Sequence, residues 1–268
     1  MKRTTRTPRD SPRLSVALAH AGVASRRVCD AMIQAGRVTV DGEVVRVPAT
    51  RVDPTRAAIC VDGERIAAAA ALRYWVVHKP RGVVSTTSDP EGRRTVLDLV
   101  EAEGRLYPVG RLDSASEGLL LVTNDGALAQ RMLHPSFEVP RIYRVAIEGI
   151  IDDETMARLV VGVELDDGEV AVARAVRLLA AKSGRSRIEM VLTEGRRRQI
   201  RRMLEAVGHP VRRLVRVAFG PLRLGGLAAG TARPLRADER EMLAQLVRSG
   251  GRRDTARPSA RRARAPRI

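Results

Sequence analysis

The stretch GRLDSASEGLLLVTNDG, residues 110–126, decides the fold around it. Its segment 119–122 is wholly apolar, which predicts a buried strand. Asp113 comes just before this strand, on a loop between Gly110 and Gly118. A carboxylate placed there is anchored to the core yet can face a cleft, as a nucleophile or base requires. On the residues alone, the favoured alternative is an aspartate that only forms a turn or caps a helix.

Outward from this stretch, the chain predicts strands and helices without a regular β-α repeat. Asn124 and Asp125 precede one of the helices and are suited to cap it. Strands are expected at 74–78, 83–86, 106–109, 119–123, 143–147, 170–174, 187–192 and 211–217. Helices are expected at 95–101, 126–133, 152–161, 198–207 and 237–247. Residues 73–247 should therefore form an α+β domain with a largely antiparallel mixed sheet flanked by helices.

A smaller module is expected at residues 12–66. An apolar helical pattern begins at Leu14 and ends before Gly22, and Ser25 can cap a second helix that ends near Gly36. Asp-Gly pairs, which favour tight hairpins, interrupt the apolar segments that follow. Strands are expected at 38–40, 44–47 and 59–61.

Positive charge dominates the composition. Lys and Arg number 48 against 31 Asp and Glu, which gives a formal net charge of +17. The ends at 1–11 and 248–268 are basic and rich in Pro, Ser and Thr, which predicts disordered tails, and 67–72 is expected to be a linker. The charge favours nucleic acid as the partner. For the tails alone, solvated segments that aid solubility are the alternative.

Several classes of protein lack support because their patterns are missing. No apolar run approaches the ~20 residues of a membrane span, and no secretory signal is visible. The two cysteines form no CxxC pair, and the four histidines lack the spacing of a zinc site. A phosphate-binding Gly-Lys-Ser/Thr loop and a GxGxxG motif are also missing. We therefore expect a cytoplasmic protein without a metal, a nucleotide or another cofactor.

The N-terminal module carries a recognisable set of motifs, namely Arg13-Leu14, AGVASRR at 21–27 and AGRVTVDG at 35–42. These motifs resemble those of S4 RNA-binding domains. Arg26 and Arg27 stand at the start of the second expected helix, where free backbone N–H groups suit a phosphate. Arg37 follows the end of that helix, and all three arginines are candidate RNA-binding residues. A solvated helix face is the alternative.

The larger domain carries several long motifs in order, namely His78-Lys79-Pro80-Arg81-Gly82, the stretch 110–126, Arg141-Ile142-Tyr143, EGRRRQIRRM at 194–203, Gly208-His209-Pro210 and Arg213-Leu214. Together they resemble the RsuA/RluB family of ribosomal-RNA pseudouridine synthases over most of residues 72–236. The resemblance implies that Asp113 is the catalytic residue. Arg141 and Val215 depart from the family, which often has lysine there, and this affects substrate contacts more than the chemistry.

Further residues are candidates beside Asp113. Tyr143 begins a strand and can stack on an extruded base, although an ordinary core tyrosine is the favoured alternative on the residues alone. Arg201 lies at the rim of a helix's apolar face, where it can pair with Asp113 and keep the carboxylate charged. Other arginines of that helix point away from this face, toward phosphates or solvent, and a solvated basic helix is the alternative. The candidate RNA-binding residues of this domain are Arg111, Arg196, Arg198 and Arg202.

The motifs therefore predict an enzyme that isomerises a uridine of ribosomal RNA to pseudouridine, with large-subunit RNA favoured over small-subunit RNA. The target base must leave its stack, because its glycosidic bond is otherwise inaccessible. The partner is expected to be ribosomal RNA or a pre-ribosomal particle, and the chain a monomer. The alternative is a non-catalytic S4-type RNA-binding factor of ribosome assembly. A methyltransferase is disfavoured, since no loop for its cofactor is found.

Overall fold

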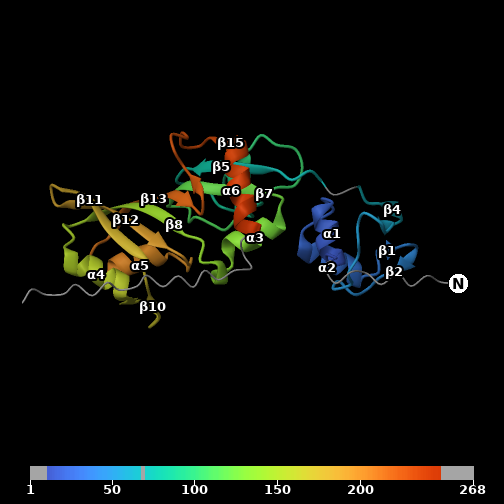
Figure 1. The fold of residues 1–268 in the computed structure, drawn as a ribbon, viewed down its shortest axis with the longest axis horizontal. Coiled ribbons are helices and arrows are strands. Elements are labelled where there is room, and N and C mark those ends of the chain that lie inside the picture. Colours follow the sequence, from blue (N-terminus) through green and yellow to red (C-terminus); the bar gives the residue numbers. More distant parts are fainter. Residues whose placement is uncertain (1–10, 68–69, 249–268) are drawn as a thin grey trace, which may run out of the picture.

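The computed structural model describes residues 11–67 and 70–248, which form a small N-terminal module and a larger domain (Figure 1). Most of the two tails that were expected to be disordered, and residues 68–69 of the expected linker, lie outside these ranges. Of the tails, the structure describes Ser11 and Arg248. Ser11 is buried, and Arg248 is the last residue of a helix. No helix within the described ranges is long and apolar enough to cross a membrane.

Two helices and a small sheet form the N-terminal module. Its helices are α1 (Leu14–His20) and α2 (Arg26–Gln34). Its strands lie in the order β2–β1–β3–β4, with β1 (Val38–Val40), β2 (Glu43–Val44), β3 (Ile59–Val61) and β4 (Glu64–Arg65). The side chain of Ser25 accepts a hydrogen bond from the backbone N–H of Val28 at 3.2 Å, so α2 begins where the sequence predicts. The helices and the sheet share one apolar core that includes Leu14, Leu18, Cys29, Ile33, Val38 and Ile59.

The larger domain is built on a nine-stranded sheet. Its main order is β11–β12–β8–β13–β7–β5–β15, with β14 paired to β13 and β6 paired to β7. The strands are β5 (Tyr74–Lys79), β6 (Tyr107–Pro108), β7 (Glu117–Thr123), β8 (Arg141–Glu148), β11 (Ala175–Lys182), β12 (Arg185–Leu192), β13 (Val211–Phe219), β14 (Leu222–Arg223) and β15 (Ala232–Pro234). Among the described strands, β13 and β7 alone pair in parallel. The expected antiparallel mixed sheet is therefore confirmed.

Helices flank this sheet, as the sequence predicts. They are α3 (Gly126–Leu133), α4 (Asp153–Val161), α5 (Gln199–Ala206) and α6 (Ala237–Arg248), with the 3-10 helices η1 (Val96–Leu99) and η2 (Pro135–Phe137). A separate two-stranded sheet joins β9 (Val163–Glu164) to β10 (Val170–Ala171). α4 and α5 share one apolar core with β8, β12 and β13, whereas α3 and α6 share a second core with β5 and β7. Figure 1 shows α4 and α5 together on one side of β8 and β12.

Four of the expected elements differ from the structure, and one long strand was not expected. The strand expected at 44–47 is the short β2, which ends at Val44. Residues 83–86 form no strand, and Val84 makes only an isolated bridge to Thr95. The expected helix 95–101 is the short 3-10 helix η1. The long strand β11 was not expected, because it lies at the sheet edge with most of its residues exposed and so lacks an apolar alternation. β10 covers only the first two residues of the strand expected at 170–174.

The parallel contact between β7 and β13 requires a glycine. Gly118 is paired with Arg216 and has φ +116°, in the region that favours glycine. A Cβ atom added to Gly118 would lie 2.3 Å from the backbone oxygen of Arg216. The glycine therefore lets the start of β7 approach β13 closely, which brings the loop that carries Asp113 beside β13.

Candidate active site

The side chain of Asp113 has no structural partner. A backbone hydrogen bond of 2.9 Å from Ser116 to the Asp113 carbonyl closes the turn that carries it. The carboxylate is exposed, accepts no hydrogen bond and forms no ion pair with the part of the chain that the structure describes. Asp125 contrasts with it, because its carboxylate accepts hydrogen bonds from the Leu128 N–H at 3.0 Å and from the Tyr74 hydroxyl at 2.9 Å. The capping role is therefore confirmed for Asp125 and wrong for Asp113.

Hydrogen bonds fix the backbone on both sides of Asp113. Before it, Leu112 is buried, its N–H donates to Ser85 Oγ at 3.1 Å, and its carbonyl accepts from the same hydroxyl at 2.9 Å. After it, the Ser114 carbonyl accepts from the Gly82 N–H at 3.0 Å. The loop is therefore held in place by its neighbours while the carboxylate itself stays free.

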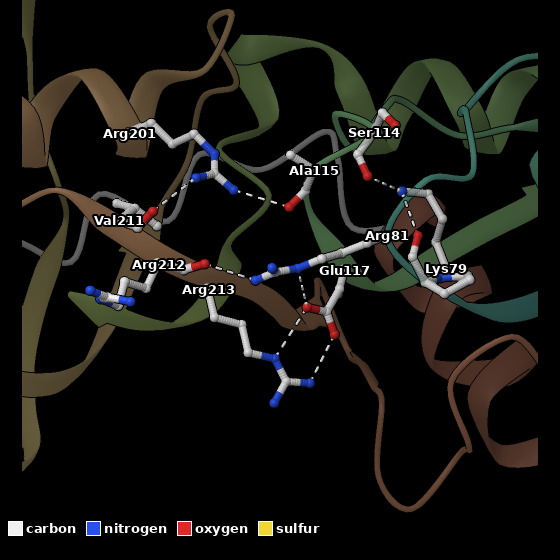
Figure 2. A network of polar contacts seen from close by, with 10 residues as sticks. Lys79, Arg81, Ser114, Ala115, Glu117, Arg201, Val211, Arg212 and Arg213 are labelled. Carbon is white, nitrogen blue, oxygen red and sulfur yellow. Dashed lines mark hydrogen bonds and ion pairs between the residues drawn. The ribbon is translucent and has the colours of Figure 1, made fainter. Parts of the chain in front are cut away.

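Lys79 supports the same loop from inside the protein. It is fully buried, and its Nζ donates to the carbonyls of Pro80 at 2.9 Å and Val83 at 2.7 Å. The Ser114 carbonyl lies 3.5 Å from the same Nζ (Figure 2). Burial lowers the pKa of Lys79 from 10.5 to about 8, and the nearby negative charge of Asp113 opposes this shift. Lys79 was not among the residues predicted for the site. Its place beside Pro80 in a recognised motif was the available signal.

We expect Lys79 to make the free energy of unfolding increase with pH. Its pKa in the folded chain, about 8, is below the ordinary value of 10.5, so between these values the unfolded chain binds more protons and the folded state gains stability as the pH rises. Below about pH 8 the lysine is charged in both states and the gain is absent. In urea unfolding, the free energy of unfolding of wild type relative to that of Lys79→Met should rise between about pH 8 and pH 10.5. The rise should be at most about 1.4 kcal/mol per pH unit. A difference that does not change with pH would contradict the assignment.

The side chain of Arg201 contacts the backbone of the Asp113 loop. Its Nη2 donates to the Ala115 carbonyl at 3.1 Å, and its Nη1 donates to the Val211 carbonyl at 3.2 Å (Figure 2). The expected ion pair with Asp113 is not formed, because the guanidinium is directed to these two carbonyls. Burial lowers the pKa of Arg201, and the charge of Asp113 nearby opposes that effect. Arg201 therefore joins the loop after Asp113 to the start of β13.

A buried carboxylate organises two arginines beside this loop. Glu117 accepts hydrogen bonds from Arg213 at 2.8 and 3.1 Å and from Arg81 at 2.8 Å (Figure 2). Arg81 also donates to the Arg212 carbonyl at 2.8 Å. The hydrogen bonds from Arg213 lower the pKa of Glu117, and Arg81 adds to this effect. The network ties the first residue of β7 to β13 and keeps Glu117 ionised.

Asp113 borders an open cavity of about 360 Å³. Tyr143 of β8 also lines this cavity, with the apolar side chains of Leu192, Ile200 and Leu214. Six arginines line it as well, namely Arg111, Arg141, Arg196, Arg197, Arg198 and Arg216. Arg201 is not among the lining residues. The structure therefore brings Asp113, Tyr143, Arg111 and Arg196 to one cavity. It also places Arg198 there, against expectation, and leaves Arg201 outside the cavity wall.

Arg216, like Lys79, was not predicted for the site from the sequence. It is 2% exposed, and its Nε donates to the Leu119 carbonyl at 2.8 Å. Its Nη2 is buried and has no hydrogen-bond partner in the described chain. It lies across from Tyr143 in the pairing of β13 with β8. A buried guanidinium with an unused donor is costly unless a ligand completes it, so Arg216 points to an acceptor from outside the protein.

The arginines of the 194–203 motif fall into two groups. Arg198 has φ +51° and stands before α5, so the helical periodicity that placed it on the outward face does not apply, and its side chain reaches the cavity. Arg202 forms ion pairs with Asp166 and Asp167. Arg196 donates to Glu169 at 2.9 Å while also lining the cavity. Sequence position could not reveal these acidic partners, because they come from the turn before β10.

The candidate residues of the N-terminal module also differ among themselves. Arg26 and Arg27 are exposed in the first turn of α2 and have no hydrogen bond or ion pair from their side chains to any described residue. Arg37 instead forms two hydrogen bonds with Asp62, at 2.9 and 2.5 Å. Arg26 and Arg27 are therefore available to a ligand, whereas Arg37 must first break its hydrogen bonds with Asp62.

An exposed carboxylate beside a tyrosine and six arginines suits an anionic ligand that carries a ring, and a nucleotide has both features. Within residues 11–67 and 70–248, no group of three or more His, Cys, Asp or Glu side chains could hold a metal ion. The fold and the site define the class as an enzyme that acts on nucleic acid.

Comparisons with known proteins identify the family. A model of the RNA pseudouridylate synthase family matches residues 73–206, and an S4 domain model matches residues 12–56. An uncharacterized RNA pseudouridine synthase of Mycobacterium tuberculosis is 44% identical over 88% of this chain and 94% of its own length. The ribosomal large subunit pseudouridine synthase B of Bacillus subtilis is 40% identical over 89% of this chain and 98% of its own length. A crystal structure of a pseudouridylate synthase aligns with a TM-score of 0.62 and 26% identity, over 87% of this chain and all of the other.

The chain therefore belongs to the RNA pseudouridylate synthase family and is an RNA pseudouridine synthase with an S4 domain. The family and the fold that the motifs predicted are both confirmed.

Proposed function

We propose that this enzyme converts a uridine of large-subunit ribosomal RNA to pseudouridine, with Asp113 as the nucleophile. The observation that carries the proposal is the free Asp113 carboxylate, held by its backbone at a cavity lined by six arginines and Tyr143. The choice of RNA follows relatives from Bacillus subtilis and Yersinia pestis, both named ribosomal large subunit pseudouridine synthase B.

The reaction moves one glycosidic bond and requires no net redox change. The target nucleotide leaves its stack and enters the cavity. Asp113 adds to the ribose or the base while the C–N bond breaks. The freed base turns and joins the ribose through C5. The proton on C5 is then lost, and the nitrogen that held the ribose takes up a proton. The ionised carboxylate is regenerated, so the atoms of substrate and product balance without a cofactor.

Tyr143 and Arg216 complete the nucleotide site in this proposal. Tyr143 stacks on the extruded base, a contact worth about 1–3 kcal/mol, and is placed to assist the loss of the C5 proton. Arg216 offers its unused Nη2 donor to an acceptor oxygen of the nucleotide. Arg201 acts as a positioning residue, because its hydrogen bond to Ala115 holds the turn in which Asp113 sits.

The remaining arginines bind the surrounding RNA. Arg26 and Arg27 take phosphate at the start of α2, and Arg111 and Arg198 take phosphates near the cavity. The other candidate contacts are Arg37, Arg196 and Arg202, whose carboxylate partners a phosphate would have to displace. We further propose that the enzyme works as a monomer in the cytoplasm, on ribosomal RNA or a pre-ribosomal particle.

Purified enzyme tests this function on two unmodified transcripts. Full-length large-subunit and small-subunit ribosomal RNA are incubated with the protein, and pseudouridine is mapped at single-nucleotide resolution. We expect one or a few sites in the large-subunit RNA and none in the small-subunit RNA. Modification confined to small-subunit RNA would overturn the substrate, and tight RNA binding without any pseudouridine would favour a non-catalytic assembly factor.

A further inference from the structure

A second groove lies on the opposite face of the sheet from the catalytic cavity. Along β8, Tyr143 lines the catalytic cavity while its neighbours Ile142 and Arg144 line the groove. Along β13, Arg216 lines the cavity while Val215 and Val217 line the groove. Because successive side chains of a strand point to opposite faces, the two hollows are separated by the thickness of the sheet.

This hollow, the rear groove, has a volume of about 760 Å³. Its lining residues belong to β8, β11, β12, β13 and β14 and to the two residues after β14, and none belongs to a helix. α4 and α5 pack with the other face of these strands (Figure 1). The rear groove is therefore a sheet face that the described chain leaves open to a partner.

Positive charge lines the rear groove. Four arginines line it, namely Arg144, Arg187, Arg213 and Arg223, and Glu189 is the single acidic residue of the lining. Glu189 lies 3.9 Å from Arg144, and Arg213 is paired with Glu117. Arg187 has no hydrogen bond or ion pair from its side chain among the described residues. Arg223 donates only to backbone carbonyls, at 2.8 and 3.1 Å. Two guanidinium groups in one groove therefore lack a carboxylate, which leaves them free to bind an anion.

The spacing of these arginines suits an extended anion. Arg187 of β12 and Arg213 of β13 both pair with Ala146 of β8, one on each side. They are thus two strand spacings apart, about 10 Å, and Arg144 lies two residues along the middle strand. Ala146 lies between Arg187 and Arg213, and Ile142 and Val215 add apolar surface farther along the groove. Charges at the rim and apolar contacts at the floor match the phosphates and sugars of an RNA strand.

We propose that the rear groove binds the backbone of a second segment of the substrate RNA, away from the segment that enters the catalytic cavity. The inference rests on the proposed function for its choice of RNA. One segment would bind the S4 domain and the catalytic face, and a second would pass across the rear face. A long ribosomal RNA fragment can occupy both faces, whereas a short stem-loop around the target uridine occupies only the first.

A triple substitution, Arg144→Gln with Arg187→Gln and Arg223→Gln, tests the groove. Arg213 stays, because its contact with Glu117 supports the catalytic loop. The matched control removes three exposed charges elsewhere, with Arg158→Gln, Arg174→Gln and Arg240→Gln. Both proteins lose the same net charge, so a difference between them reports position rather than charge.

Binding is measured for a long large-subunit RNA fragment and for a short stem-loop across a range of salt concentrations. We expect the groove variant to bind the long fragment about tenfold or more weakly, and to lower the slope of log K against log salt by about 2, since each lost phosphate contact contributes about 0.7–0.9. Its affinity for the stem-loop and its single-turnover rate on saturating stem-loop should match those of the control.

Equal affinities and slopes for the groove and control variants on the long fragment would overturn the proposal. Equal RNA binding by the two variants is also the result expected if an acidic protein, rather than RNA, occupies the groove. The proposed function fails separately, namely if wild type forms no pseudouridine in large-subunit RNA. Loss of binding to the long fragment by the groove variant would then still support the RNA contact.

Discussion

Pseudouridine formation is expected to fall below detection in Asp113→Asn, a loss of at least about 10³-fold. The amide nitrogen and oxygen of asparagine are poor nucleophiles, while the size and shape of the side chain hardly change. Single-turnover conversion of a saturating RNA fragment measures the effect directly. RNA affinity should stay within about threefold of wild type, because phosphate contacts dominate binding and this substitution removes none.

The same variant should unfold like wild type. The Asp113 carboxylate accepts no hydrogen bond and forms no ion pair with the described residues, so its loss removes no structural contact. Asp125→Ala is the control, because Asp125 caps α3 and accepts a hydrogen bond from Tyr74, and alanine can do neither. It should be destabilised while keeping its turnover. Product formation by Asp113→Asn near the wild-type rate would refute the catalytic assignment.

Gly118→Ala is expected to lower the free energy of unfolding by about 3 kcal/mol or more. The new Cβ would lie 2.3 Å from the Arg216 backbone oxygen, and the residue would keep φ +116° only under strain. Separating β7 from β13 would also move the Asp113 loop, so turnover should fall even in the molecules that remain folded. Urea unfolding and single-turnover kinetics measure the two effects.

Gly184→Ala separates close packing from backbone strain. Gly184 has φ +69° in the β11–β12 hairpin, with open space where a Cβ would lie. Its replacement should cost only about 1 kcal/mol and leave turnover unchanged. Equal losses of stability in the two variants would show that the approach of β7 to β13 is not the constraint inferred here.

Local patterns predicted most of the elements. The Ser25 cap and the Asp125 cap fixed the starts of α2 and α3, and the apolar run 119–122 marked the buried centre of the sheet. β11 escaped prediction, because an exposed edge strand has no core that would impose alternation on its sequence. Sheet order and the parallel contact of β7 with β13 depend on long-range packing, which no local pattern specifies.

Only the site residues that lie in recognisable sequence motifs could be predicted from the sequence. Asp113 and Tyr143 were placed from sequence, and both line the cavity. Arg198 was misplaced, since a helical wheel fails for a residue with φ +51° before the first helical turn. The roles of Lys79 and Arg216 depend on burial and on hydrogen bonds to distant carbonyls, and a list of residues contains neither.

The most direct test of the central claim, that Asp113 catalyses pseudouridine formation in ribosomal RNA, is pseudouridine mapping in cells. Ribosomal RNA is sequenced at single-nucleotide resolution from a strain that lacks this gene, and from the same strain carrying either the wild-type or the Asp113→Asn protein. The account predicts that a large-subunit pseudouridine disappears on deletion, returns with wild type and stays absent with Asp113→Asn. An unchanged pseudouridine map after deletion, or restoration by Asp113→Asn at comparable protein levels, would contradict it.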